Sequence, residues 1–187
     1  MNFINTVYNF VVEPSKAVND IIKSRSLFMS FLGYVTGSLS IMIMFALEAG
    51  GMGGLSFTLT FLTVLFMDIC IGFFISSGAH LLLELSTGKG SAAGLFTLVG
   101  LSQFALTLLV SFALMEAALP ALSVLKFFVF LAVACIQFYF VLFMMNKAYG
   151  LSKIRTFFTL VLSFVPAVLS LFAACGAVVF LIVWMCI

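Results

Sequence analysis

A single carboxylic acid, Asp68, lies near the middle of a long apolar stretch. A charge at the centre of a bilayer costs roughly 3 kcal/mol on insertion scales, so we expect Asp68 to be neutral and to face protein or water. Counted by depth along the apolar stretches, Thr36 and Gln103 reach about the same level, and Gln137 lies in a further stretch. We expect Asp68 to donate a hydrogen bond to Gln103 or to accept one from Thr36. These four residues, together with His80 and Glu84 further along the same stretch as Asp68, form a candidate intramembrane polar site.

Two interpretations of this polar site remain open. Polar side chains inside a membrane commonly hold transmembrane helices together by hydrogen bonds. A carboxyl at the midplane can instead serve a proton- or ion-coupled step. Asp68 has no cationic partner at its depth, which favours the first interpretation.

Small and polar side chains recur every four residues after Asp68, at Gly72, Ser76, His80 and Glu84. Residues four apart share one face of a helix, so this spacing predicts a ridge that a neighbouring helix can approach closely. We expect His80 and Glu84 to form a hydrogen-bonded pair at the end of the ridge. The chain has no second histidine, so we predict no metal site here.

Glycines with the same spacing lie in the first apolar stretch, at Gly33 and Gly37. Two small residues four apart let transmembrane helices pack closely. The pattern predicts a close helix contact, either within the chain or between subunits.

The elements that must position these side chains follow from an almost uncharged composition. The chain has 187 residues, of which 65% are hydrophobic and 7% charged. A transmembrane helix needs about 20 predominantly apolar residues. Five continuous apolar stretches qualify, and the lack of alternation disfavours a β-barrel: 26–47, 57–83, 94–115, 122–145 and 156–187. We predict an all-α fold, a polytopic bundle of five transmembrane helices. The last stretch either kinks at Pro166, which we favour, or has its first turns in the interface and crosses the membrane from Ala167 onward.

Residues 1–25 form a separate amphipathic segment before this five-span region, which covers 26–187. Phe3, Val7 and Phe10 recur at helical spacing, and Pro14 suits the first turn of a second helix. The pattern predicts two short helices on the cytoplasmic leaflet. A frayed terminus is the alternative.

Basic residues are segregated between the predicted loops. Only Lys126 lies at one end of the spans, and the other seven lie at the opposite end: Lys16, Lys23, Arg25, Lys89, Lys147, Lys153 and Arg155. Short basic loops stay in the cytoplasm. We therefore predict a cytoplasmic N-terminus and an outside C-terminus.

Motifs for several chemistries are missing from the sequence. The run Gly88–Ser91 resembles a phosphate-binding loop only superficially, because the upstream glycine and the residue after the lysine are wrong. There is no His-Glu-x-x-His motif, no nucleophile elbow and no basic surface for nucleic acid. The four cysteines show no metal-ligand spacing. We expect no enzymatic activity, no cofactor and no nucleic-acid partner.

Three local motifs resemble the Ypt-interacting protein (Yip) family. They are residues 14–18 (PSKAV), residues 78–91 (GAHLLLELSTGKGS) and residues 146–153 (NKAYGLSK). The resemblance covers nearly the whole chain and implies a five-span Yip domain that begins in the cytoplasm. Family members often carry Tyr and Pro in the third span, where this chain has Leu101, Ser102 and Gln103.

The resemblance is to the short, prokaryotic form of the family, because eukaryotic members have a long cytosolic region before the first span. It therefore implies the prokaryotic cytoplasmic (inner) membrane and does not imply binding to Rab-type GTPases. We expect a non-enzymatic membrane protein that organises lipid or acts as an adaptor for partner proteins or for a second copy. The alternative is a small transporter or channel, or a subunit of one, that uses Asp68.

Overall fold

The computed structural model describes residues 27–87 and 91–186, and every regular element in these ranges is a helix. The elements are α3 (Leu27–Glu48), α4 (Gly54–Thr87), α5 (Ala92–Ser102), η1 (Gln103–Leu106), α6 (Thr107–Ala118), η2 (Pro120–Leu125), α7 (Lys126–Tyr149) and α8 (Lys153–Cys186). The predicted all-α architecture is confirmed for this part of the chain. The predicted amphipathic segment 1–25 and Lys89 lie outside the described residues.

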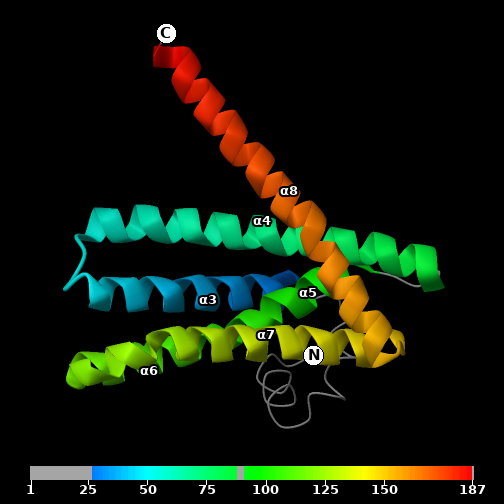
Figure 1. Cartoon of the computed structure of the whole chain (residues 1–187), viewed down its shortest axis with the longest axis horizontal. Coiled ribbons are helices and arrows are strands. Elements are labelled where there is room, and N and C mark those ends of the chain that lie inside the picture. Colours follow the sequence, from blue (N-terminus) through cyan, green and yellow to red (C-terminus); the bar gives the residue numbers. More distant parts are fainter. Residues whose placement is uncertain (1–26, 88–90, 187) are drawn as a thin grey trace.

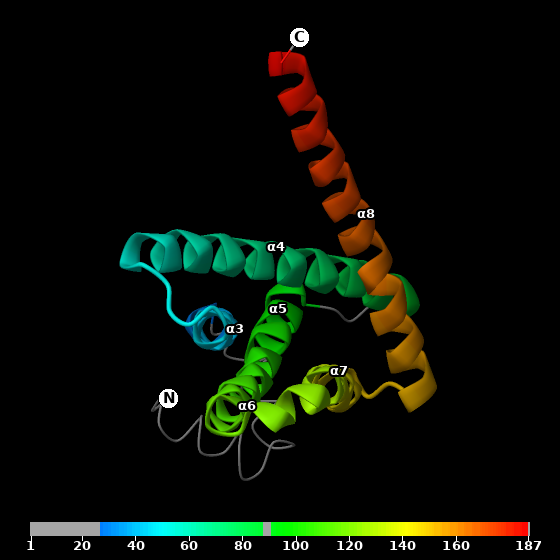
Figure 2. The ribbon, with the colours of Figure 1, turned by 60° about the vertical axis from the view of Figure 1, so that its left-hand side comes forward.

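Successive helices reverse direction, so that α3, α4, α5 with α6, and α7 form a bundle (Figure 1). The last helix, α8, packs against α4 and α7 at a steep angle, and its C-terminal half extends beyond the other helices (Figures 1 and 2). All the described connections are short, and Gly50 and Gly51 supply the positive φ angles that the turn between α3 and α4 requires.

Four helical segments are long and apolar enough to cross a membrane, judged by length and composition in the described residues. They are Leu27–Glu48, Gly54–Leu85, Ala92–Ala118 and Pro120–Tyr149, and they overlap the first four predicted spans. The fifth predicted span falls within α8, which continues as one helix through Pro166. Its passage through the membrane and its kink stay predictions.

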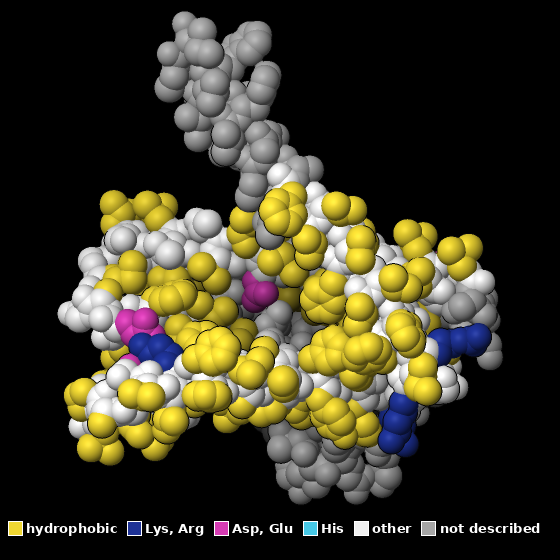
Figure 3. Space-filling model, in the orientation of Figure 1, with side chains coloured by type: hydrophobic (Ala, Val, Ile, Leu, Met, Phe, Trp, Pro, Cys, Tyr) yellow, Lys and Arg dark blue, Asp and Glu magenta, His cyan; other side chains and the backbone are white. Residues whose placement is uncertain are grey.

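The bundle has inner and outer helices. In the most apolar 18-residue part of each candidate span, 50% of the residues are buried for α3 and for the α5–α6 segment. The buried share is 11% for α4 and 17% for the η2–α7 segment. The outer helices expose large side chains such as Phe66, Phe73 and Phe127, and hydrophobic groups cover the visible face (Figure 3). Soluble monomers rarely expose such large apolar surfaces, whereas hydrocarbon solvates them. The architecture is therefore that of an integral membrane protein.

Glycines allow α3 to approach α5 and η1 very closely. A Cβ atom on Gly33 would lie 2.0 Å from the carbonyl oxygen of Gly100, and one on Gly37 would lie 2.9 Å from the Cβ atom of Gln103. These contacts involve backbone or the rigid start of a side chain, so a larger residue cannot be accommodated by a rotamer change. The glycine face of the first span therefore packs within the chain.

The third predicted span is interrupted by the 3-10 turn η1 between α5 and α6. Hydroxyl groups flank the turn and bond backward to the backbone: Ser102 Oγ donates to Val99 O, and Thr107 Oγ1 donates to Phe104 O, both at 2.7 Å. Such bonds compete with the regular helical ladder and commonly bend helices. The turn sets the position of Gln103 at mid-bundle, where it is largely buried.

Candidate functional site

Two apolar core clusters lie at the two ends of the bundle, and polar residues occur between them. On α3 the clusters include Tyr34 and Met44, and on α7 they include Val141 and Val133. Ser38 lies between the first pair in sequence, and Gln137 lies between the second. The bundle therefore has a polar layer near its middle.

This polar layer consists of Ser38, Asp68, Gln103 and Gln137, joined by hydrogen bonds. Ser38 Oγ donates to Asp68 Oδ2 at 3.2 Å, and Gln103 Nε2 donates to Asp68 Oδ1 at 3.1 Å. Gln137 Nε2 in turn donates to Gln103 Oε1 at 2.7 Å. The chain of three hydrogen bonds connects α3, α4, η1 and α7, so each of the four candidate spans contributes one residue.

The structure changes two details of the predicted site. Thr36 Oγ1 donates to Leu32 O in its own helix at 2.8 Å, and Ser38, two residues further along, is the α3 residue that binds Asp68. Counting residues along each span predicted the correct depth in the membrane for the α3 residue, but it could not predict which face of α3 points to Asp68. Asp68 also accepts the hydrogen bond from Gln103 rather than donating it, since Gln103 Nε2 faces Asp68 Oδ1 and Gln103 Oε1 faces Gln137.

Burial differs along the polar layer. Ser38 is fully buried and Gln103 is 9% exposed, whereas Asp68 and Gln137 are half-buried. Asp68 and Gln137 lie on the outer helices α4 and α7, and Ser38 and Gln103 lie on the inner pair. The layer therefore runs from the interior of the bundle toward its surface.

A cavity of about 530 Å³ lies beside the polar layer, between α4, α5, α7 and α8. We call it the central hollow. Ser102, Gln103 and Gln137 are its polar lining residues, and its other lining residues are apolar: Ile71, Ile75, Val99, Ala134, Cys135, Phe138, Val141, Leu160 and Phe164. Cys135 is an exposed free thiol, so the cavity reaches the surface at α7. Figure 3 shows the surface hollowed between α4 and α7, with an acidic side chain visible at its margin.

Asp68 is not among the residues that line the central hollow, although its partner Gln103 is. A molecule in the hollow would first meet the amides of Gln103 and Gln137. Their hydrogen bond uses Gln103 Oε1 and Gln137 Nε2, so Gln137 Oε1 is able to accept a hydrogen bond from a ligand. The hollow can therefore hold a mainly apolar molecule with a small polar group.

The predicted ridge on α4 packs against α3 at Gly72. A Cβ atom on Gly72 would lie 1.9 Å from Tyr34 Oη, so only glycine leaves room for this fully buried tyrosine. Ser76 is buried and its Oγ donates to Gly72 O at 2.7 Å. Tyr34 Oη has no hydrogen-bond partner among the described residues. This part of the ridge contributes packing and adds no group aimed at the hollow.

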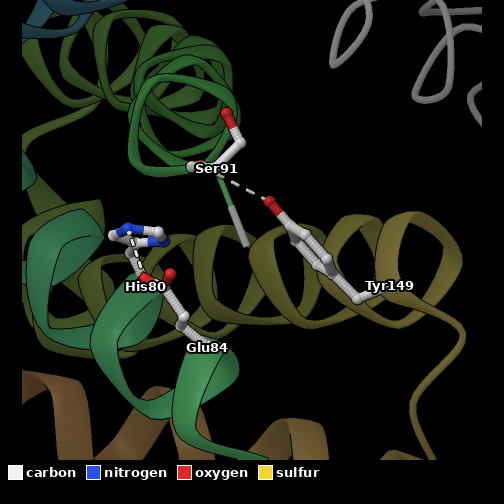
Figure 4. A network of polar contacts seen from close by, with 4 residues as sticks. All are labelled: His80, Glu84, Ser91 and Tyr149. Carbon is white, nitrogen blue, oxygen red and sulfur yellow. Dashed lines mark hydrogen bonds and ion pairs between the residues drawn. The ribbon is translucent and has the colours of Figure 1, made fainter. Parts of the chain in front are cut away.

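The ridge ends in the predicted pair, with His80 Nε2 lying 3.1 Å from Glu84 Oε2. Figure 4 shows His80 and Tyr149 on either side of the start of α5 at Ser91. Tyr149 Oη donates to Ser91 O at 3.5 Å, and Ser91 Oγ caps α5 by accepting from Gly94 N at 3.2 Å. The tyrosine hydrogen bond links the end of α7 to the start of α5, whereas the His80–Glu84 pair lies within α4. No group of three or more possible metal ligands occurs in the described residues.

One charged cluster was not predicted from the sequence. Lys126 Nζ lies 3.1 Å from Glu48 Oε1 and 2.9 Å from Glu116 Oε1, at the end of the bundle opposite His80. Figure 3 shows a basic side chain beside acidic ones at one end of the bundle, and further basic side chains at the other end. The sequence could have predicted this cluster, because Lys126, Glu48 and Glu116 all lie on the same predicted side of the membrane.

Comparisons with protein-family models, curated proteins and solved structures gave no match to this chain. The central hollow, the polar layer and the distribution of charge are the features of the chain that bear on its function.

Proposed function

We propose that this protein is a non-enzymatic integral membrane protein of the Yip type that organises the membrane by holding a lipid in its central hollow. The observation that carries the proposal is a surface-connected cavity of about 530 Å³ with apolar walls and two amide side chains. Cavities of roughly 300–1,000 Å³ with few polar groups are typical of small-molecule sites.

A lipid fits the hollow better than a water-soluble molecule does. The cavity lies at the level of Gln103 and Gln137, midway along the candidate spans, and its entrance at α7 is surrounded by exposed apolar residues such as Leu131 and Ile136. A molecule entering there comes from the hydrocarbon region. An amphipathic molecule with a hydroxyl or ester group could bind Gln137 while its apolar part packs on Phe138 and Phe164.

The proposed orientation has the basic end of the bundle in the cytoplasm of a prokaryotic cell, with the N-terminus on that side. Lys147, Lys153 and Arg155 lie around the turn between α7 and α8, whereas Lys126 at the opposite end is paired with two glutamates. An excess of basic residues on one side supports this orientation. A lipid-bound surface of this kind can also serve as a platform for partner proteins or for a second copy.

The proposal can be tested with a pair of tryptophan variants on α7. Ala134 lines the hollow, and Leu131 is an exposed residue one turn away that does not line it. Ala134→Trp should fill the hollow and abolish retention of co-purified lipid in native mass spectrometry, whereas Leu131→Trp should retain it. Equal lipid retention by both variants, or a wild-type protein that retains none, would contradict the proposal.

A small transporter or channel is the second candidate, because the polar layer leads from the hollow to Asp68. Hydrogen bonds from Gln137 to Gln103 and from Gln103 to Asp68 could relay a change at the hollow to the carboxyl group. Proton flux in liposomes that is present in the wild type and absent in Asp68→Asn, with folding unchanged, would favour this candidate. Absence of flux in both proteins would favour the lipid-binding proposal.

A further inference from the structure

A second cavity lies at the basic end of the bundle, separate from the central hollow. It has a volume of about 370 Å³ and is formed by the end of α7 and the start of α8. Its lining includes Lys147 and Lys153, the side chains of Tyr139 and Phe143, and Asn146. Within residues 27–87 and 91–186 no acidic side chain lines this cavity, so its described charged lining residues are the two lysines.

The chemistry of this cavity changes along α7. Lys147 is in the last turn of the helix, and Tyr139 lies eight residues earlier, about 12 Å deeper along the axis. The rings of Tyr139 and Phe143 stack with their centroids 6.3 Å apart. The cavity is therefore cationic at the end of the span and aromatic toward the middle, which matches a molecule with an anionic head and an apolar tail.

The backbone between the two lysines is held in place. Gly150 ends α7 in the left-handed conformation, with φ of 63°. Asn146 Nδ2 donates to Leu151 O, and Ser152 Oγ accepts from Arg155 N at 3.4 Å. These bonds fix the short turn, so that Lys147 and Lys153 extend from a defined frame.

The start of α8 has an unusual distribution of charge. Its first turn carries Lys153 and Arg155 and no acidic residue. The N-terminus of a helix has a partial positive charge, so cations there are unfavourable and an anion is favourable. A bound anion would offset both the helix dipole and the two lysines.

We propose that this cavity binds an anionic phospholipid, with its phosphate group between Lys147 and Lys153 and the upper part of an acyl chain against Tyr139 and Phe143. Basic pockets between transmembrane helices on the cytoplasmic side are suited to such headgroups. A free phosphate ion would use only the lysines and leave the aromatic wall empty. This site does not depend on the function proposed for the central hollow.

The test compares two neighbouring basic residues in the first turn of α8. Lys153 lines the cavity, whereas Arg155 does not, and each carries one positive charge. Purified protein is titrated with phosphatidylglycerol or with phosphatidylcholine, and bound lipid is counted by native mass spectrometry. We expect Lys153→Gln to weaken phosphatidylglycerol binding about fivefold, the Lys147→Gln and Lys153→Gln pair to weaken it more, and Arg155→Gln to change it less than twofold.

Three results would overturn this inference. One is equal loss of binding in Lys153→Gln and Arg155→Gln, which would show general attraction to charge. Another is equal affinity for phosphatidylcholine and phosphatidylglycerol. The third is full competition by inorganic phosphate at the concentration of the lipid, which would indicate a free-anion site. Replacing both lysines by arginine keeps the charges and should retain binding, which separates loss of the site from loss of folding.

Discussion

The polar layer predicts a specific response to removal of the Asp68 carboxyl group. Asp68→Leu keeps a similar size but leaves Ser38 Oγ and Gln103 Nε2 without their acceptor. Hydrogen bonds between transmembrane helices contribute about 0.6 kcal/mol on average and up to about 1.7 kcal/mol each. Loss of two such bonds should therefore lower the free energy of unfolding by about 1–3 kcal/mol.

Asp68→Asn is the matched control for this prediction. Its side-chain oxygen can accept from Gln103, and its amide can donate to Ser38 Oγ, so both contacts persist with altered direction. The expected loss is below about 1 kcal/mol. A double-mutant cycle between Asp68→Leu and Ser38→Ala isolates one bond and should give a coupling free energy of about 0.6 kcal/mol.

The measurement is equilibrium unfolding in mixed detergent micelles, with helix content followed by circular dichroism. An Asp68→Leu protein as stable as the wild type would refute the account of the polar layer as a link between four spans. A coupling energy of zero with Ser38 would refute the specific contact. An Asp68→Asn protein as unstable as Asp68→Leu would show that the charge, and not the hydrogen bonding, matters.

Three glycines give further predictions, all measured by the same unfolding assay. Gly33→Ala should lower the free energy of unfolding by about 1–3 kcal/mol, because its Cβ would meet the Gly100 backbone. Gly53→Ala is the control: Gly53 has open space around it, so the free energy of unfolding should change by less than about 0.5 kcal/mol. Equal effects of the two substitutions would contradict the close contact of α3 and α5. Gly72→Ala should cost a similar 1–3 kcal/mol or so through Tyr34, and a neutral result would show that the ring can move. Gly150→Ala should lower the free energy of unfolding by about 1 kcal/mol, because position 150 has a positive φ angle that alanine adopts unfavourably. An unchanged free energy of unfolding would show that the turn rearranges.

Much of the fold could be predicted from the sequence, because continuous apolar stretches of about 20 residues in a bilayer form transmembrane helices. The first four apolar stretches overlap the four candidate spans. The break at Gln103–Leu106 could not be predicted, since neither glycine nor proline occurs within it. It depends on hydroxyl groups of Ser102 and Thr107, whose effect on a helix depends on the rotamer they adopt.

The candidate site was predictable in level but not in detail. Counting residues along each span brought Asp68 and Gln103 to the same depth, and the structure joins them by a hydrogen bond. Counting residues could not show whether Thr36 or Ser38 binds Asp68, because the answer depends on how α3 is rotated about its axis. The close contact of Gly33 with α5 fixes that rotation. The central hollow had no sequence signal, since it arises from the angle at which α8 crosses α4.

The most direct test of the lipid-binding claim is photo-crosslinking with a lipid that carries a diazirine in its acyl chain. The protein is labelled after detergent extraction and gel filtration, when only tightly held lipid remains. The account predicts crosslinks on residues that line the central hollow, such as Ala134, Phe138 and Phe164, and none on the outer face of α4 at Leu55 or Phe66. Crosslinks spread evenly over both surfaces, or absent from the hollow, would contradict it.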